Sequence, residues 1–226
     1  MKLAVIIPDR NDRPLFLANC LRMLKKQTLQ PDHIELVNYE PNLIGCDITQ
    51  RYKFGYEKLK NKGFDLIAFI ENDDFYAENY LQTMVNGWVN ADKPDLFGTN
   101  YTIYYHINMF SYFTMYHQER SSMMSTVMKP DLNITWCEEN DPFTDAYLWS
   151  ISTARDGNGY LRGVIFEPKE HICLGIKHGV GMCGGGAHID LLNRYYQHGK
   201  EDKDAEFLQS IMDEESYEFY ANYFNK

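Results

Sequence analysis

The sequence has few cysteines and no hydrophobic run long enough to cross a membrane. The five cysteines form an odd set without a Cys-x-x-Cys spacing, which argues against a disulfide framework or a structural zinc and favours a reducing compartment. No stretch approaches the ~18 apolar residues of a membrane span. The opening MKLAVIIPDR has only a short apolar run before Pro8, unlike a signal peptide. We therefore expect a cytoplasmic protein without a membrane span.

Basic residues are scarce relative to acidic ones, with 22 Lys and Arg against 32 Asp and Glu and a net charge of −10. Proteins that bind nucleic acid regardless of sequence gain most of their affinity from Lys and Arg that displace counterions from phosphates. The charge therefore argues against a broad nucleic-acid surface, although a local basic groove stays compatible with it. The length of 226 residues suits one α/β domain. Its 15% aromatic content suits core packing or stacking on sugars and bases.

Strand and helix patterns alternate through the first half of the chain. Leu3 to Ile7 is a continuous apolar run, as in a strand buried on both faces, and Pro14 then supplies a helix start. Helical spacing continues from there to Gln27. The pattern further predicts strands at 33–38 and 64–70 and helices at 47–60 and 78–89. This order predicts an α/β fold with a Rossmann-type, mainly parallel sheet.

Alternating, β-rich segments dominate the second half, which predicts an antiparallel extension of the sheet. The first two expected strands form an antiparallel pair joined near residues 106–107. No linker rich in Pro, Gly or Ser marks a second domain, so we expect a single domain over residues 1–226. The expected segments are strands at 96–105, 108–117, 163–166 and 172–176, a loop or short helix at 120–128, and helices at 141–149 and 200–212.

Three polar clusters follow the predicted strands of the first half, at Asp9–Arg13, Tyr39–Glu40 and Glu71–Asp74. The carboxyl ends of parallel strands share one edge of a sheet, where ligands bind in such folds, so the clusters are expected to converge. The acidic cluster suits Mg²⁺ or Mn²⁺, which prefer oxygen ligands. Taken alone, it could equally cap the following helix.

Two blocks of the sequence resemble the family-two glycosyltransferases, which have the GT-A fold. VIIPDRNDRPLFLANCLRMLKKQT resembles their opening strand, Arg-Pro pair, Leu-rich helix and Gln-Thr close, and FDLIAFIENDDFYAENYL resembles their acidic metal motif and its flanks. The resemblance covers residues 1 to about 90. It implies a GT-A-like glycosyltransferase, and phage-type enzymes are one group within that class. Such an enzyme moves a sugar from a nucleotide-diphosphate sugar to an acceptor hydroxyl with inversion. The matching residues of the first block are Pro8, Arg10, Asn11, Arg13, Pro14, Leu17, Leu21, Gln27 and Thr28.

The resemblance also implies roles for individual residues. Glu71-Asn72-Asp73 stands where the family carries Asp-x-Asp, with Asp73 as the direct ligand of Mn²⁺ or Mg²⁺. His178 follows the last core strand, where GT-A enzymes commonly recruit a further metal ligand. The donor, a UDP-sugar in the first place, is expected to contact Pro8, Arg10, Arg13, Glu40, Arg51, Glu71, Asn72 and His188.

Some of these assignments have ordinary alternatives. The second strand ends in Asn-Tyr-Glu rather than in consecutive acids, which leaves Glu40 as the substitute for recognising the donor base. Arg51 could equally be a solvated helix arginine. The glycine-rich tract 179–186 lets backbone N–H groups approach phosphate, but such tracts are also often only connectors. A lone histidine such as His178 or His188 is more often structural than a ligand.

Inverting transfer needs a base for the acceptor hydroxyl, and the family takes it from an acid that opens a short helix in the C-terminal half. The candidates are Glu138, Glu139, Asp141 and Asp145. We favour Asp145, because neighbouring aromatic residues could raise its pKa by desolvation. The alternative is an acid that only interacts with the helix dipole. We thus expect residues 1–95 to bind the nucleotide sugar and residues 96–226 to bind the acceptor.

Several acceptors and two other classes of protein stay open. A saccharide or another small-molecule acceptor suits the acidic charge, whereas a hydroxymethylated base in phage DNA suits the compact size. A nucleotidyltransferase also uses paired acids and a metal, but it usually has a Gly-rich, Lys-containing loop after the first strand, and Pro8-Asp9-Arg10-Asn11 differs from that loop. A non-catalytic nucleotide-sugar-binding protein would be distinguished by its failure to hydrolyse a donor.

Overall fold

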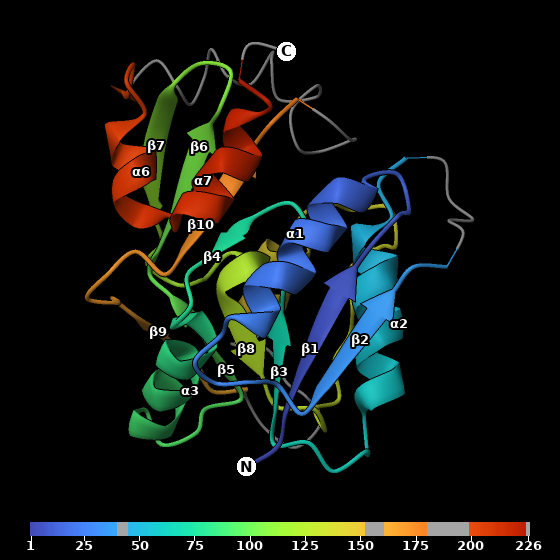
Figure 1. Ribbon diagram of the computed structural model, residues 1–226. Coiled ribbons are helices and arrows are strands. Elements are labelled where there is room, and N and C mark those ends of the chain that lie inside the picture. Colours follow the sequence, from blue (N-terminus) through green and yellow to red (C-terminus); the bar gives the residue numbers. More distant parts are fainter. Residues whose placement is uncertain (40–44, 152–160, 180–198, 225–226) are drawn as a thin grey trace.

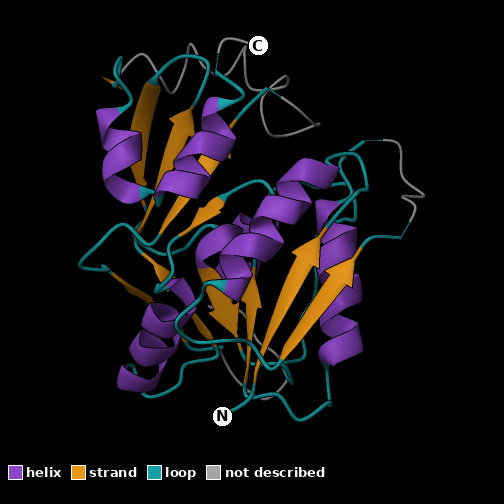
Figure 2. Cartoon of the chain, in the orientation of Figure 1, coloured by secondary structure: helices purple, strands orange, loops and turns teal. Residues whose placement is uncertain are grey.

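A computed structural model of the protein describes residues 1–39, 45–151, 161–179 and 199–224. Within these residues the chain forms two β-sheets with helices packed against them (Figures 1 and 2). The first sheet has the order β2-β1-β3-β8-β5-β9 and consists of β1 Leu3–Pro8, β2 His33–Val37, β3 Leu66–Phe69, β5 Leu96–Thr99, β8 Thr126–Met128 and β9 Gly163–Phe166. The second has the order β11-β7-β6-β10-β4 and consists of β4 Phe75–Tyr76, β6 Tyr101–His106, β7 Ser111–Tyr116, β10 Cys173–Lys177 and β11 Lys200–Glu201. The described helices are α1 Pro14–Lys25, α2 Ile48–Leu59, α3 Tyr80–Asn90, α4 Thr144–Ile151, α6 Glu206–Ile211, α7 Glu214–Ala221 and the short 3₁₀ helix Met123–Ser125.

β1 lies between β2 and β3, parallel to both, and its alternating side chains serve both faces of the sheet. Leu3, Val5 and Ile7 belong to the core that contains residues of α1 and α3. Ala4 and Ile6 belong to the core that contains residues of α2 and α4. The fully buried apolar run thus has the cause expected from the sequence, namely a central strand covered by helices on both sides.

α2 packs closely on the first sheet at Gly55. A Cβ atom at Gly55 would lie 2.8 Å from Cγ2 of Ile6 and 3.0 Å from Cγ2 of Val37, so a larger residue would push the helix outwards. This close packing places the start of α2, with Asp47 and Arg51, at the carboxyl ends of β1 and β2.

The second sheet shares a core with the first. Side chains of β6 and β10, among them Tyr105 and Ile176, lie in the same buried cluster as Leu3 and Phe16. β10 runs parallel to β6 and antiparallel to β4, so its end, at Lys177, comes close to the loop after β3. α6 and α7 cover the second sheet, and α7 also contacts α1 (Figure 1).

Three expected segments differ from the observed structure. The segment expected as a loop or short helix over 120–128 ends in the strand β8. The strand expected over 96–105 is divided at Asn100, where the chain passes from the first sheet into the second. The helix expected over 200–212 begins only at Glu206, because the Asp202 carboxylate accepts the backbone N–H groups of Phe207 and Leu208 and fixes a turn before it. The expected antiparallel pair of the second half is confirmed as β6 and β7.

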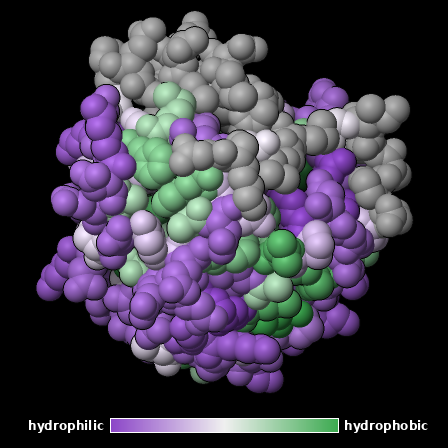
Figure 3. Space-filling model, turned by 45° about the horizontal axis from the view of Figure 1, so that its top comes forward, coloured by the Kyte–Doolittle hydropathy of each residue, from purple (hydrophilic) through white to green (hydrophobic). Residues whose placement is uncertain are grey.

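The fold is therefore a mixed α/β structure with a mostly parallel first sheet and a second, mainly antiparallel sheet. None of its described helices is both long enough and apolar enough to span a membrane. The face shown in Figure 3 is mostly hydrophilic, with hydrophobic residues gathered in separate patches. The division of roles between residues 1–95 and 96–226 stays a prediction.

Candidate active site

The carboxyl ends of β1, β2 and β3 are joined by Asp9, which follows β1 and is buried. Its Oδ1 accepts a 2.7 Å hydrogen bond from Nδ2 of Asn72, which follows β3. Its backbone N–H donates to the carbonyl of Val37 at the end of β2. Asn11 donates from Nδ2 to the carbonyl of Asn38 at 2.7 Å. The convergence predicted for the three polar clusters is thus observed for their described residues.

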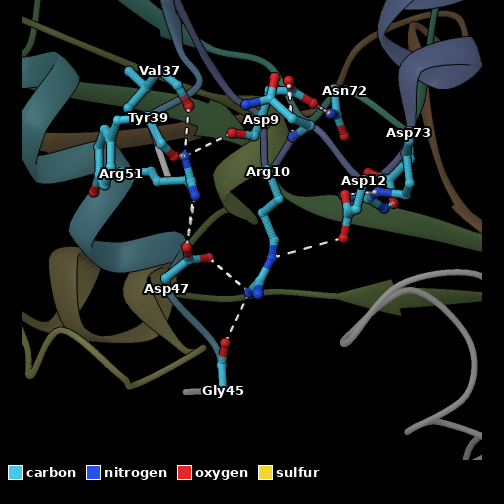
Figure 4. Close-up of polar contacts among 12 residues, drawn as sticks. Asp9, Arg10, Asp12, Val37, Tyr39, Gly45, Asp47, Arg51, Asn72 and Asp73 are labelled. Atoms are coloured by element: carbon cyan, nitrogen blue, oxygen red, sulfur yellow. Dashed lines mark hydrogen bonds and ion pairs between the residues drawn. The ribbon is translucent and has the colours of Figure 1, made fainter. Parts of the chain in front are cut away.

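Arg51 fastens α2 to these strand ends. Its Nη1 donates to the carbonyls of Asp9, Val37 and Tyr39 at 2.7, 3.0 and 3.0 Å. Its Nε and Nη2 lie 3.0 and 2.9 Å from Oδ2 of Asp47 (Figure 4). Arg51 is only 1% exposed, so it is not a solvated helix arginine. Its observed partners give it a structural role, and a contact with the donor stays a prediction.

Arg10 lines a pocket beside this network. Its Nη1 donates to the carbonyl of Gly45 at 2.8 Å and to Oδ1 of Asp47 at 3.0 Å, and its Nε lies 3.8 Å from Asp12 (Figure 4). The pocket has a volume of about 140 Å³ and opens to solvent. Its lining residues are Pro8, Arg10, Asp12, Arg13, Cys46, Asp47, Ile48, Arg51, Glu71, Asn72, Asp73, Pro142 and Lys177.

Three carboxylates cluster at the site, and two of them, Glu71 and Asp73, line the pocket. Glu71, Asp73 and Asp74 follow β3, and one oxygen of each lies within 4.8 Å of the others. Oδ2 of Asp73 lies 2.9 Å from Nε2 of His178 and also accepts a hydrogen bond from Nη1 of Arg13. The structure therefore brings together Asp73 and His178, the two residues predicted to bind a metal ion.

Burial and charge give these carboxylates different pKa values. Burial, followed by the charge of Asp73, raises the pKa of Glu71 to about 7. Burial also raises the pKa of Asp74 well above its ordinary value, with the charges of Glu71 and Asp73 adding to the effect. Burial opposes ionisation of Asp73 as well, but its hydrogen bond with His178 and the charge of Arg13 outweigh it and lower the pKa. Asp73 is therefore the firmly ionised member of the group at neutral pH.

The donor set fits Mg²⁺ or Mn²⁺. Carboxylate oxygens suit both ions, and an imidazole nitrogen can also bind Mn²⁺, which is a transition-metal ion. Three clustered carboxylates and the buried imidazole beside Asp73 provide such a set next to the pocket. A divalent ion would also offset the mutual repulsion that, in addition to burial, raises the pKa values of Glu71 and Asp74.

Three further elements hold the metal-binding candidates in place. Oδ1 of Asp74 accepts the backbone N–H of Ile176 in β10 at 2.8 Å. The hydroxyl of Tyr220 in α7 donates to the carbonyl of Asp73 at 3.2 Å. Phe16 of α1 lies with its ring 4.2 Å from the His178 ring. The metal-binding candidates are thus fixed by α1, α7 and β10, all distant in sequence from β3.

Asp145 lies in the first turn of α4, as expected from the sequence. Its Oδ2 accepts a 2.8 Å hydrogen bond from Nη1 of Arg120. Burial raises the pKa of Asp145 although the charge of Arg120 opposes it. Asp145 is close enough to the acidic group for its charge to raise the pKa of Glu71. Its role as a base stays a prediction.

The sequence reasoning missed several residues of this site. Asp47 accepts hydrogen bonds from Arg10 and Arg51. Lys177 lines the pocket, and Arg120 forms an ion pair with Asp145. For Lys177 a signal was present, since it directly precedes His178 at the end of a predicted strand. For Asp47 and Arg120 no local pattern exists, because their partners are distant in sequence. The predicted donor contacts Glu40 and His188 lie outside the described residues.

Comparison with solved structures supports the fold assignment. Residues 1–349 of S. aureus TarS in complex with UDP are 13% identical to this chain, with a TM-score of 0.53 and coverage of 78% of this chain and 60% of that one. A second structure of S. aureus TarS 1–349 is 12% identical, with a TM-score of 0.52 and coverage of 77% and 60%. This chain spans about three-fifths of the length of those chains. No protein-family model and no curated protein matches the sequence. At this identity the likeness shows the fold, which is GT-A-like.

Proposed function

We propose that this protein is a metal-dependent glycosyltransferase that moves a sugar from a nucleotide-diphosphate sugar to an acceptor hydroxyl. The observation that carries the proposal is the cluster of Glu71, Asp73 and Asp74, with His178 against Asp73, at the carboxyl ends of a GT-A-like sheet. Glu71 and Asp73 of this cluster line the pocket. A UDP-sugar is the first donor to test, because UDP is bound to TarS in a structure of this fold.

Asp73 and His178 would hold Mn²⁺ or Mg²⁺, with Glu71 and Asp74 beside them. When bound, such an ion neutralises the negative charge of the departing diphosphate. Arg13 fixes the Asp73 carboxylate, while Pro8, Arg10 and Asn72 shape the side of the pocket where we place the donor. These roles follow from the position of each residue in the pocket and from the ligand preferences of the ions.

Asp145 is the base in this proposal. It accepts the proton of the acceptor hydroxyl as the hydroxyl oxygen bonds to the anomeric carbon, and the bond from that carbon to the diphosphate oxygen breaks on the opposite face. The products are an inverted glycoside and a nucleoside diphosphate. The raised pKa of Asp145 favours this role, because a stronger base accepts the proton more readily.

A panel of nucleotide sugars, each with and without Mn²⁺, tests the proposal through release of nucleoside diphosphate. Many transferases hydrolyse their donor slowly without an acceptor, so the acceptor need not be known. We expect release from one donor class that depends on added metal. Saccharides and hydroxymethylated DNA are then compared as acceptors with that donor. Absence of release from every donor, with metal and acceptors present, would contradict the proposed activity.

A further inference from the structure

Four basic side chains line the pocket, and one of them differs from the other three. The three arginines, Arg10, Arg13 and Arg51, donate hydrogen bonds to carboxylates or carbonyls of the protein. The ammonium group of Lys177 forms no hydrogen bond or ion pair with any residue that the structure describes, although its backbone carbonyl accepts the N–H of Ile107. Its ammonium group therefore has three N–H donors that no described protein acceptor uses.

The backbone of the second sheet explains how Lys177 is held. Its Nζ lies 5.0 Å from the centre of the Tyr104 ring. Tyr104 is the cross-strand neighbour of Gly175, and a Cβ atom at Gly175 would lie only 2.6 Å from Cδ1 of that ring. The absent side chain lets the ring lie across β10. Residue 177 projects from the same face of the strand as residue 175, so the ring contacts the cation directly.

The surroundings of this ammonium call for an anionic ligand. A charged group in a desolvated site is costly unless hydrogen-bond acceptors surround it. The carboxylates of Glu71, Asp73 and Asp74 lie near enough to stabilise the charged form of Lys177 electrostatically, although none of them forms an ion pair with it. In the proposed function a metal ion offsets the charge of these carboxylates, so the ammonium group needs another anionic partner. A diphosphate held by that ion would carry further oxygens within the same pocket, and these are suitable acceptors for an ammonium group.

We propose that Lys177 binds the diphosphate of the nucleotide-sugar donor, and of the nucleoside diphosphate after transfer, as a second cation beside the metal. This inference rests on the proposed function and names a residue outside the acidic motif. It gives the negative charge that develops on the leaving oxygen a fixed partner from the protein.

Calorimetric titration of UDP and of inorganic pyrophosphate, both with saturating Mn²⁺, tests this role. The variants are Lys177→Gln, Lys177→Arg and the control Lys200→Gln. Lys200 also places its Nζ over a ring, 5.9 Å from the centre of Tyr112, but it is exposed and lies outside the pocket. We expect Lys177→Gln to weaken both ligands about ten- to hundredfold, as for loss of a charged hydrogen bond. Lys177→Arg should retain most of the affinity, and Lys200→Gln should bind as the wild type does.

Titration of Mn²⁺ without nucleotide separates phosphate binding from a structural role. Lys177→Gln removes a positive charge beside the carboxylates, so Mn²⁺ should bind at least as tightly as in the wild type. Weakening of Mn²⁺ alone to the same extent as UDP would overturn the assignment, because the variant would then have disturbed the whole site.

The outcomes also separate this inference from the proposed function. If the wild type binds UDP and Lys177→Gln binds it equally well, the role of Lys177 is wrong and the proposed function stands. If only pyrophosphate binds and Lys177→Gln weakens it, Lys177 is supported and UDP is the wrong nucleotide. If neither ligand binds to the wild type, both the inference and its basis are overturned.

Discussion

Asp73 receives a hydrogen bond from Arg13 and lies against His178 through a single oxygen, which makes it the best-defined side chain of the acidic group. Asp73→Asn keeps the size of the side chain but removes the charge that would attract a metal ion. We expect Mn²⁺ binding to be lost and nucleoside diphosphate release to fall by roughly 10²–10³-fold. The exposed Asp204→Asn is the matched control for loss of one negative charge. Near-normal release by Asp73→Asn would remove the metal assignment.

Asp145 can be separated from a residue that only supports a helix end. Loss of a general base costs typically ~10²–10⁴ in rate, whereas loss of a charge at a helix end costs about 0.3–1 kcal/mol of stability. Asp145→Asn should therefore bind Mn²⁺ and UDP normally but transfer sugar at least about a hundredfold more slowly. Glu206→Gln is a suitable control, because Glu206 is an exposed acid in the first turn of another helix, α6. Equal transfer rates in the two variants would place the base elsewhere.

His117 gives the fold a specific dependence on pH. Burial, with a contribution from the charge of Arg120, lowers its pKa from 6.5 to about 4. Between these values the unfolded chain binds a proton that the folded protein does not, so the free energy of unfolding falls as the pH drops. The variant His117→Asn has no titrating group at this position, so its stability lacks this dependence on pH. Urea unfolding at pH 7 and pH 5 should show a loss for the wild type that exceeds the variant's by on the order of 1 kcal/mol. Parallel losses would show that His117 does not titrate in this way.

At the scale of single elements, α7 links the C-terminal part of the chain to the metal-binding candidates. The hydroxyl of Tyr220 donates to the carbonyl of Asp73, whereas the hydroxyl of Tyr217 in the same helix accepts from Gln209 at the surface. Tyr220→Phe should raise the Mn²⁺ concentration needed for half-maximal activity several-fold, because one bond of about 1 kcal/mol no longer fixes the loop. Tyr217→Phe should leave this concentration unchanged. The same shift in both variants would indicate a general effect of α7 on stability.

The sequence predicts elements well where burial produces a long local pattern. β1, α1, α2 and α3 were expected within a few residues of their observed bounds, since each shows a continuous or periodic apolar pattern. β8 was missed because a strand of three residues is too short to show alternation, and its place between β3 and β5 is set by hydrogen bonds to those strands. α7 was missed because ion pairs between Arg22 and the acids Asp213 and Glu215 stabilise it from another part of the chain.

The residues of the candidate site also fall into those that local sequence patterns predict and those that only the three-dimensional structure shows. The sequence could place Asp73 at the end of a buried strand, and the family resemblance pointed to His178 as its neighbour. It could not show that Arg51 is buried against three carbonyls or that Lys177 lies beneath the Tyr104 ring, because both contacts depend on strands pairing at a distance. Local patterns therefore predict which groups follow a strand, while the partners of those groups follow from the three-dimensional structure.

At the scale of the whole molecule, charge separates the alternative acceptors. The chain carries a net charge of −10, and three of the four basic residues that line the pocket bind acceptors of the protein itself. Binding to a DNA backbone would need exposed Lys and Arg that displace counterions, and it would weaken steeply as salt is raised. The charge distribution therefore favours a saccharide or another small acceptor over DNA.

We accordingly expect transfer to be insensitive to duplex DNA. Unmodified duplex added in excess should change the rate of transfer to a saccharide acceptor by less than about twofold, both at 50 mM and at 200 mM salt. Free pyrophosphate is the positive control for competition, because it would occupy the donor pocket at either salt concentration. Inhibition by DNA at 50 mM salt that disappears at 200 mM would instead identify a nucleic-acid surface. In that case hydroxymethylated DNA would become the acceptor to test, since a surface that holds a duplex beside Asp145 would bring a base hydroxyl towards the proposed base.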